Sequence, residues 1–378
     1  MRHCSNTSAG ILITISIIMI LTGCEADETP PELPLIEYKL VITDSIGVEI
    51  GDPNYILGWP VSLTHSPDGN IVFLDRMKQS VFMYTPDGEF IRTIGREGEG
   101  PGEFHVPSGL SFYPDGSLLI GDMNGIVLFD SNYDFKNRMN WPTFTPFLIT
   151  ALDGGGFIGK QITFKPDEDR VIWLTTLARW DGDEDPSVEY FTIEYEWDIG
   201  SGVVDFIRSR EHTIHCCVTR NGRVFYSQSS IDEFVIHGCE PDGTSFLYIV
   251  DENFHRVRKS EDELQTEMDN YSSYINMMTG GSPIDIPVEL DPYKHALLGM
   301  FIDGEERLWV RLGFYPGIVF RVYDMSGEIL FHVMMDYPGN PLDLISWQIT
   351  GDEHGFLAVN ISHEYSQKIY MLTLVEAE

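Results

Sequence analysis

The sequence has few basic residues and few cysteines, and each shortage excludes a class of protein. Of its 378 residues only 24 are lysine or arginine, against 59 aspartates and glutamates, so the formal net charge is −35 at pH 7. Such a surface repels phosphate backbones, which argues against nucleic acid as a partner. Five cysteines are too few for a disulfide scaffold. No P-loop, GxSxG or HExxH pattern occurs either.

The amino terminus has the pattern of a secretion signal. A basic start at Arg2 precedes an apolar run, Ile11–Leu21, that is too short to span a bilayer comfortably. The run ends in Leu21-Thr22-Gly23-Cys24, which resembles the lipobox of bacterial lipoproteins. That resemblance implies a signal peptide at 1–23 and lipidation of Cys24; an ordinary secretion signal with an incidental cysteine is the alternative.

Residues 24–36 are then expected to form the lipidated cysteine and a flexible tether, because the segment after Cys24 is acidic, rich in proline and without apolar periodicity. The protein would be anchored by lipid to the bacterial cell envelope, in the outer membrane, facing the periplasm or the cell surface. The membrane is therefore one expected partner.

The rest of the chain repeats one short pattern six times: an apolar strand, a turn that carries Asp or Asn with Gly, and a second apolar strand. The turns lie at 67–69, 114–116, 153–155, 220–222, 303–305 and 351–353. Asp and Asn bond their own backbone and glycine supplies positive φ, so these are hairpin turns. Four-stranded units without helical crossovers predict an all-β fold, a six-bladed β-propeller of four-stranded antiparallel blades, over residues 37–378.

One stretch of the sequence identifies a family. Ile94–Phe104 (IGREGEGPGEF), followed by Pro107–Leu110 and the turn at 114–116, closely resembles the NHL repeat. It is most similar to six-bladed propeller lipoproteins of Gram-negative bacteria, most of which have no assigned activity. The resemblance is strong over 66–135 and weaker elsewhere. In the third unit two apolar runs stand where one is expected, so the blade boundaries within 157–213 are open.

The two ends of the chain and one insertion complete the expected fold. The last unit is one strand short, and the alternating segment Glu37–Ile42 can supply that strand and close the ring. Ser260–Glu263 is a capping box that precedes apolar residues at helical spacing: Leu264, Met268, Tyr271, Ile275 and Met278. An amphipathic helix is therefore expected in an insertion at about 258–281. Its stripe would pack on the propeller; a partner-binding helix or a lid over the axis is the alternative.

Six polar residues are expected to end the second strand of each unit, on the face where propellers of the resembling family usually bind ligands. They are Asp75, Asp122, Lys160, Gln228, Arg311 and Asn360. Their formal charges cancel, which favours a zwitterionic or polar ligand. The alternative is that each side chain caps its own loop, and Asp75 and Asp122 occupy a position that is usually structural in NHL repeats.

Metal and thiol chemistry are weaker hypotheses. His105, His212 and His295 each precede an innermost strand and could meet at the axis as zinc ligands. Related propellers include a metal-dependent peptidyl-hydroxyglycine lyase, but these histidines differ in their offsets from the turns. The acidic turns at 166–169 and 181–185 lack the spacing of a calcium loop. We therefore assign no catalytic residue, metal ligand or cofactor, with calcium or zinc as the ions to consider.

The adjacent cysteines Cys216 and Cys217 lie on a predicted strand, where their thiols would point to opposite faces; a vicinal disulfide is the alternative. Taken together, the sequence predicts a membrane-anchored extracytoplasmic binding module for a peptide, glycan or protein partner. A metal-dependent lyase or lactonase with its site at the axis is the alternative, and a structural role in an envelope assembly is a third.

Overall fold

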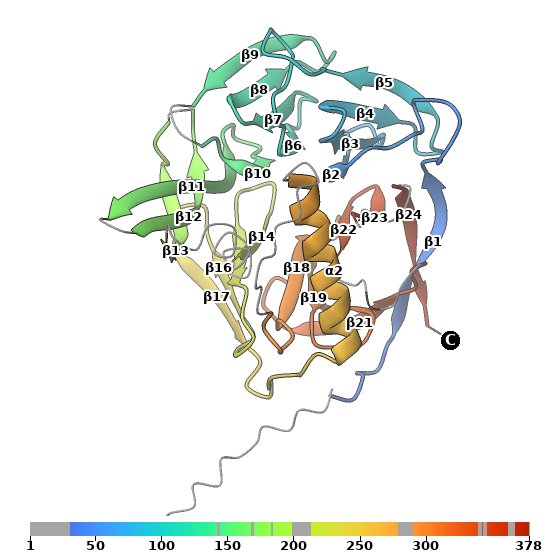
Figure 1. Ribbon diagram of the computed structural model, residues 1–378, viewed down its shortest axis with the longest axis vertical. Coiled ribbons are helices and arrows are strands. Elements are labelled where there is room, and N and C mark those ends of the chain that lie inside the picture. Colours follow the sequence, from blue (N-terminus) through green and yellow to red (C-terminus); the bar gives the residue numbers. More distant parts are fainter. Residues whose placement is uncertain are drawn as a thin grey trace, which may run out of the picture.

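Six four-stranded blades surround a central axis in the computed structural model of the protein (Figure 1). The structure describes residues 31–141, 144–167, 170–182, 184–198, 213–278, 290–338, 342, 346–361 and 367–377. These residues form 24 strands and the helix α2 (Glu261–Met278). The all-β propeller expected from the sequence is confirmed.

Each of the first two blades follows the chain order from the innermost to the outermost strand. Blade one contains β2 (Pro60–His65), β3 (Ile71–Asp75), β4 (Ser80–Tyr84) and β5 (Phe90–Ile94). Blade two contains β6 (Gly109–Phe112), β7 (Leu118–Asp122), β8 (Gly125–Phe129) and β9 (Phe135–Asn140). The first hairpin needs its glycine, because Gly69 has φ +81° and its N–H donates to the carbonyl oxygen of Ser66 at 2.8 Å.

Blades four and five have the same order. Blade four contains β14 (Ile214–Val218), β15 (Val224–Gln228), β16 (Val235–Cys239) and β17 (Ser245–Val250). Blade five contains β18 (Leu297–Ile302), β19 (Leu308–Leu312), β20 (Ile318–Tyr323) and β21 (Ile329–Met335). Middle strands are covered on both faces by neighbouring blades, so every residue of β19 is buried, whereas the outermost strand β17 is largely accessible.

Blade three has much longer strands than the others. It contains β10 (Phe147–Ala151), then β11 (Phe157–Asp167), β12 (Arg170–Trp180) and β13 (Val188–Asp198), each of eleven residues. The two apolar runs that made the third unit irregular in sequence are therefore the third and fourth strands of one blade. One expectation is wrong: Lys160 does not end its strand, because β11 continues to Asp167 and Lys160 pairs with Leu177 in its interior.

The ring closes by pairing strands from the two ends of the chain. Blade six contains β22 (Trp347–Asp352), β23 (Gly355–Asn360), β24 (Ile369–Glu376) and, outermost, β1 (Tyr38–Ile46). The antiparallel register of β1 on β24 runs from Tyr38↔Glu376 to Ile46↔Ile369. The predicted closing strand is confirmed. In addition β1 pairs in parallel with β21, which joins blades five and six into one eight-stranded sheet and covers both edges.

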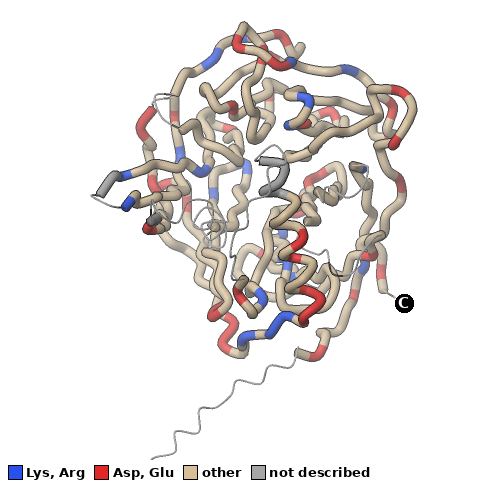
Figure 2. Tube along the Cα trace, in the orientation of Figure 1, with Lys and Arg blue, Asp and Glu red and all other residues tan. Residues whose placement is uncertain are grey.

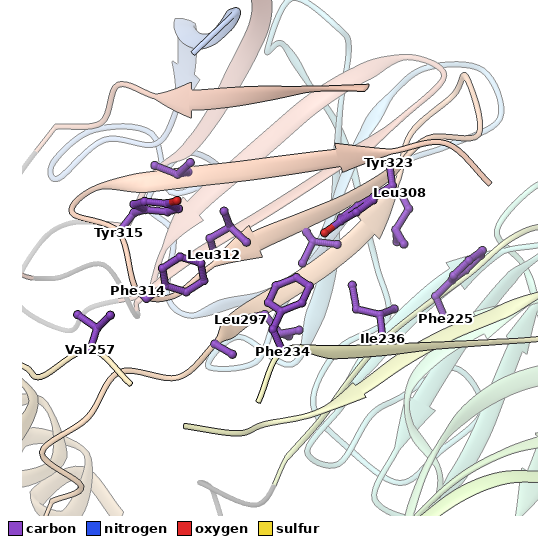
Figure 3. Packing of buried hydrophobic residues seen from close by; sticks show 13 residues of the cluster. Phe225, Phe234, Ile236, Val257, Leu297, Leu308, Leu312, Phe314, Tyr315 and Tyr323 are labelled. Atoms are coloured by element: carbon purple, nitrogen blue, oxygen red, sulfur yellow. The ribbon is translucent and has the colours of Figure 1, made fainter. Parts of the chain in front are cut away.

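The hydrophobic core lies between adjacent blades. Figure 3 shows the cluster between blades four and five, where Phe225, Phe234 and Ile236 face Leu297, Leu308 and Leu312. All six of these side chains are at most 1% exposed. Burial of such side chains contributes about 1.5–3 kcal/mol each to the free energy of folding. The blade-to-blade contacts thus hold the ring in shape and fix the strands that surround the axis.

Helix α2 is inserted between β17 and β18, and Figure 1 shows it across the face of blade five. The capping box is confirmed: the Ser260 N–H donates to Glu263 Oε2 at 2.8 Å, and the Glu263 N–H donates to Ser260 Oγ at 3.1 Å. Two partly buried ion pairs attach the helix, Lys259–Glu267 and Lys294–Glu263, both at 2.6 Å. The described attachment of the helix is therefore partly ionic.

The predicted apolar stripe of α2 contributes little to the core. Leu264, Met268 and Tyr271 are half-buried and belong to none of the six core clusters, and the side chains of Ile275 and Met278 lie outside the described part of the helix. Within the residues that the structure describes, no helix combines the length and apolarity needed to cross a membrane.

Candidate functional site: the axial channel

Two joined cavities follow the propeller axis, lined by the innermost strands. The strand-end chamber, of about 440 Å³, lies where these strands begin and is lined by residues such as Ile214, Leu298 and Trp347. The turn chamber, of about 640 Å³, lies at the hairpin turns of all six blades. Six residues line both chambers and so mark the passage between them: Thr150, Cys216, Cys217, Val218, Met300 and Phe301.

Lys160 supplies a buried positive charge to the strand-end chamber. Its side chain is 5% exposed, and its Nζ donates to the carbonyl oxygen of Ile214 on blade four at 2.8 Å. The ammonium also lies 5.6 Å from the ring centroid of Phe147. Burial lowers the pKa of Lys160, and the nearby Cys216 acts in the opposite direction. The carbonyl and the ring compensate only part of the cost of burying this charge.

Arg311 brings a second buried cation to the same chamber from blade five. It is 5% exposed, and its Nη1 donates to the carbonyl oxygen of Trp347, the first residue of β22, at 2.5 Å. The strands on either side of β19 remove this guanidinium from solvent. A guanidinium keeps its positive charge even when it is buried.

His215 lies within the electrostatic reach of both cations. Burial, followed by the charges of Lys160, His295 and Arg311, lowers the pKa of His215 to about 3. The ring is partly accessible and lines the chamber. His215 is therefore neutral at physiological pH, and the imidazole can donate one hydrogen bond and accept one.

The two aspartates among the predicted residues are structural. Asp75 is fully buried, and its carboxylate accepts hydrogen bonds of 2.7–3.1 Å from the backbone N–H groups of Gly58, Trp59, Met77 and Lys78. Asp122 is fully buried as well; it accepts from the His105 N–H at 2.7 Å and from Arg138 Nη1 at 2.6 Å. Neither lines a chamber. The loop-capping alternative holds for both, and the expectation of a ring whose charges cancel is wrong.

Gln228 and Asn360 end β15 and β23 as expected, but neither is among the described residues that line the two chambers. Of the six predicted residues, Lys160 and Arg311 line the same chamber. Sequence reasoning missed His215, which lies on the innermost strand β14. A signal was present in the sequence, because His215 is the one basic residue of the segment Ile214–Val218, on the predicted inner strand of the fourth unit.

Of the three histidines considered as zinc ligands, the structure places two. The His105 side chain is exposed, and the His295 Nδ1 lies 2.9 Å from Ser229 Oγ. His212 lies outside the described residues. In the part of the chain that the structure covers, no three His, Cys, Asp or Glu residues are grouped closely enough to hold a metal ion.

The cysteines behave as the strand geometry predicts. Cys216 and Cys217 are free thiols, and they pack against different core clusters, on opposite sides of blade four. Burial raises the pKa of both. The thiol form therefore dominates at neutral pH, and the vicinal disulfide is absent from this strand.

The turn chamber has the opposite electrostatic character. Asp153, Glu306, Asp352 and Glu353 line it. His65 Nδ1 lies 2.8 Å from Asp352 Oδ1, and Glu353 pairs with Arg220. Burial alone would raise the pKa of Asp352, but its hydrogen bonds with His65 and with the His354 N–H hold it below the ordinary value. Figure 2 shows that acidic residues also follow the outer loops of the ring, so the cationic strand-end chamber contrasts with its surroundings.

Comparison with known proteins bears on the fold. A family model described as a 6-bladed beta-propeller, DUF5128, matches residues 60–284. No curated protein sequence matches the chain. Among solved structures, a protein of Bacteroides fragilis is similar, with 13% identity, a TM-score of 0.49, and coverage of 90% of this chain and 96% of that one.

Two enzyme structures are also similar in fold. A virginiamycin B lyase from Staphylococcus aureus has 15% identity and a TM-score of 0.41, with coverage of 90% of this chain and 100% of that one. A gluconolactonase from Xanthomonas campestris has 12% identity and a TM-score of 0.43, with coverage of 88% and 98%. Likeness at these identities concerns the fold alone.

Proposed function

This chain belongs to the DUF5128 family of six-bladed β-propellers, and we propose that it is an extracytoplasmic binding protein that holds an anionic group of its ligand in the strand-end chamber. One observation carries this proposal: Lys160 and Arg311, each 5% exposed, line the same chamber on the axis. Lys160 lies on the second strand of blade three, and Arg311 lies on the second strand of blade five.

The physical reason is the cost of burying charge. A buried ammonium or guanidinium is destabilising by several kcal/mol unless an opposite charge or strong hydrogen bonds compensate it. The carbonyl oxygen of Ile214, to which Lys160 donates, carries only a partial negative charge. An anion in the strand-end chamber would supply a full negative charge to Lys160, and each charge-assisted hydrogen bond would contribute about 1.5–3 kcal/mol.

The location proposed for this activity is the cell envelope, with Cys24 as the lipid-bearing residue. The apolar run and the lipobox-like residues 21–24 support it, together with the acidic tether that follows. Cys24→Ala should move the full-length protein from the membrane to the soluble fraction of cells; continued fractionation with membranes would contradict the anchor. The ligand is a peptide, a glycan or a partner protein that meets the propeller there.

The lyase or lactonase alternative gains no support from the described residues. Such a metal enzyme needs a set of ligands at the axis, and the strand-end chamber instead contains two cations that would repel a divalent ion. We therefore retain binding as the proposed function.

Anion-dependent stability tests the proposal directly. Protein from residue 25 onward is melted in sodium acetate and in inorganic phosphate, with ionic strength held constant, since a ligand that binds the native state raises Tm by mass action. Lys160→Met and Arg311→Met should abolish the rise. Arg170→Met is the matched control, because it removes one positive charge from an exposed pair with Glu196 on blade three. An equal rise in all variants would refute the site.

A further inference from the structure

We infer that one rim of the propeller lies against the membrane, in contact with a surface of zwitterionic lipid. This apolar rim consists of five exposed side chains at the junction of blades four and five: Leu33, Leu35, Val250, Ile329 and Leu330. The inference rests on one part of the proposed function, the lipid anchor at Cys24, and adds the orientation of the folded domain. The ligand of the axial channel does not enter it.

The described part of the chain begins at this rim. Pro31 lines a groove of about 650 Å³ together with Val250, the last residue of β17, and Ile329, the first residue of β21. Figure 1 shows that the described chain starts at the lower edge of the ring in that view. The point at which the chain leaves towards Cys24 is therefore next to the apolar rim.

Leu35 faces outward because the two residues after it are held against the domain. Ile36 packs against the core cluster between blades four and five, and the Glu37 N–H donates to the His332 carbonyl oxygen at 3.2 Å. The pairing continues as the parallel ladder of β1 on β21, whose register brings Leu35 level with Leu330. Leu35 is 78% exposed, and the other members of the apolar rim are 42–52% exposed.

The length of the chain before Pro31 decides what covers this rim. Single exposed apolar side chains are common, but a group of them marks a contact with a protein or a membrane. The seven residue steps from Cys24 to Pro31 reach at most about 25 Å. A domain of this size is about 50 Å across. A lipidated Cys24 therefore keeps the apolar rim near the bilayer and the opposite blades, one and two, away from it.

Charge contributes less than apolar contact at this rim. Glu252 and Glu328 are exposed beside it, and anionic headgroups would repel them. Arg256 and Arg258, on the same loop as Glu252, carry the opposite charge, and Arg256 pairs with Asp232. Because both signs are present, attraction to anionic lipid is weak, and the apolar side chains are left to make the contact. Added salt should therefore not weaken it.

Photolabelling from the lipid phase tests the inference. The full-length lipidated protein is placed in phosphatidylcholine vesicles that contain a phosphatidylcholine with a diazirine on its acyl chain, and labelled peptides are identified by mass spectrometry. We expect the peptide with Ile329 and Leu330 to be labelled at least tenfold more than the peptide with Ile91. Ile91 is the matched reference, because it is 40% exposed on β5, the outermost strand of blade one. High salt should leave the pattern unchanged.

Charged variants separate contact through the apolar rim from mere closeness to the anchor. The double variant Leu33→Asp, Leu35→Asp should lower labelling of the peptide with Ile329 and Leu330 at least fivefold, because two carboxylates oppose entry into the lipid surface. Ile91→Asp is the matched control and should leave that labelling unchanged. Melting curves confirm that the variants are folded.

The outcomes distinguish the orientation from the anchor on which it rests. Membrane association with equal labelling of all exposed peptides, or labelling that the double variant leaves unchanged, would overturn the contact and leave the anchor in place. A Cys24→Ala protein that still fractionates with membranes would overturn both. Sedimentation of the protein from residue 25 onward tests the remaining occupant: a dimer that the double variant abolishes would make the rim an interface between copies and overturn the membrane contact.

Discussion

The Lys160 ammonium on blade three donates a 2.8 Å hydrogen bond to the carbonyl oxygen of Ile214, the first residue of the innermost strand of blade four. A side chain from the interior of a long second strand thus reaches across a blade boundary to the channel wall. The contact joins two blades and at the same time leaves a cation at the axis. Replacement of Lys160 therefore affects both the contact between the two blades and the charge at the axis.

Lys160→Met should leave the ligand-free protein close to the parental stability, because replacing a buried charge by an apolar group of similar size is often neutral or stabilising. Arg311→Ala should instead lose about 1–3 kcal/mol, since it removes a buried donor to Trp347 and most of a large side chain. Urea unfolding of both variants measures the difference. A loss of several kcal/mol for Lys160→Met would mean that its bond to Ile214 is chiefly structural.

The affinity for anions should fall as pH rises. The fall should begin below pH 10.5, the ordinary pKa of lysine. Binding requires the protonated ammonium, and burial lowers the pKa of Lys160 in the empty chamber. The bound anion favours the charged form, so binding should be accompanied by proton uptake in that range. Titrations in buffers of different ionisation enthalpy detect the uptake. An affinity that stays constant up to pH 10.5 would contradict this role of Lys160.

His215→Asn should reduce the sensitivity of the fold to acid. The folded pKa of about 3 lies below the ordinary value of 6.5, so the unfolded chain binds the proton first and stability is lost as pH falls from 6.5 towards 3. At pH 5 this single histidine should cost up to about 2 kcal/mol, at about 1.36 kcal/mol per pKa unit. Denaturant unfolding at pH 7 and pH 5 measures it. Equal losses in the parent and the variant would show that His215 titrates normally.

Asp75→Ala should destabilise the protein by about 3 kcal/mol or more, because four backbone N–H groups lose their acceptor in a buried loop. Asp122→Ala should have an effect of similar size, about 3–5 kcal/mol, since it leaves Arg138 without its buried partner. Gln228→Ala, at an exposed strand end, is the control and should stay within about 0.5 kcal/mol. Neither aspartate variant that remains folded should change anion affinity.

Removal of β1 should expose the edges of the two strands with which it pairs, β21 and β24. A protein that begins at residue 37 keeps the strand and should melt like one that begins at residue 25, whereas one that begins at residue 47 exposes the edges of both β24 and β21. Unpaired edges of that length promote aggregation, so the shorter protein should aggregate or unfold at lower temperature. Light scattering during a melt compares the three. Identical curves would mean that closure does not depend on β1.

The sequence was sufficient for the features that depend on neighbouring residues. The turn at 67–69 needs a glycine with positive φ, the Ser260–Glu263 capping box needs two residues three apart, and the blades need alternating apolar strands. Even the closing strand was predictable, because an alternating segment without a partner and a blade without its fourth strand require each other. These are local patterns, and backbone geometry fixes their outcome.

Only the tertiary structure decided which polar residues face the axis. Asp75 and Lys160 occupy the same position in the repeat, yet the Asp75 carboxylate turns back to the N–H groups of its own loop while Lys160 extends to the next blade. The difference arises from side-chain length and from the extension of β11 beyond Lys160, which removes the loop that a shorter side chain would cap. His215 entered the site because β14 is innermost, and a strand's distance from the axis is a property of the whole ring, set by the packing of one blade on the next.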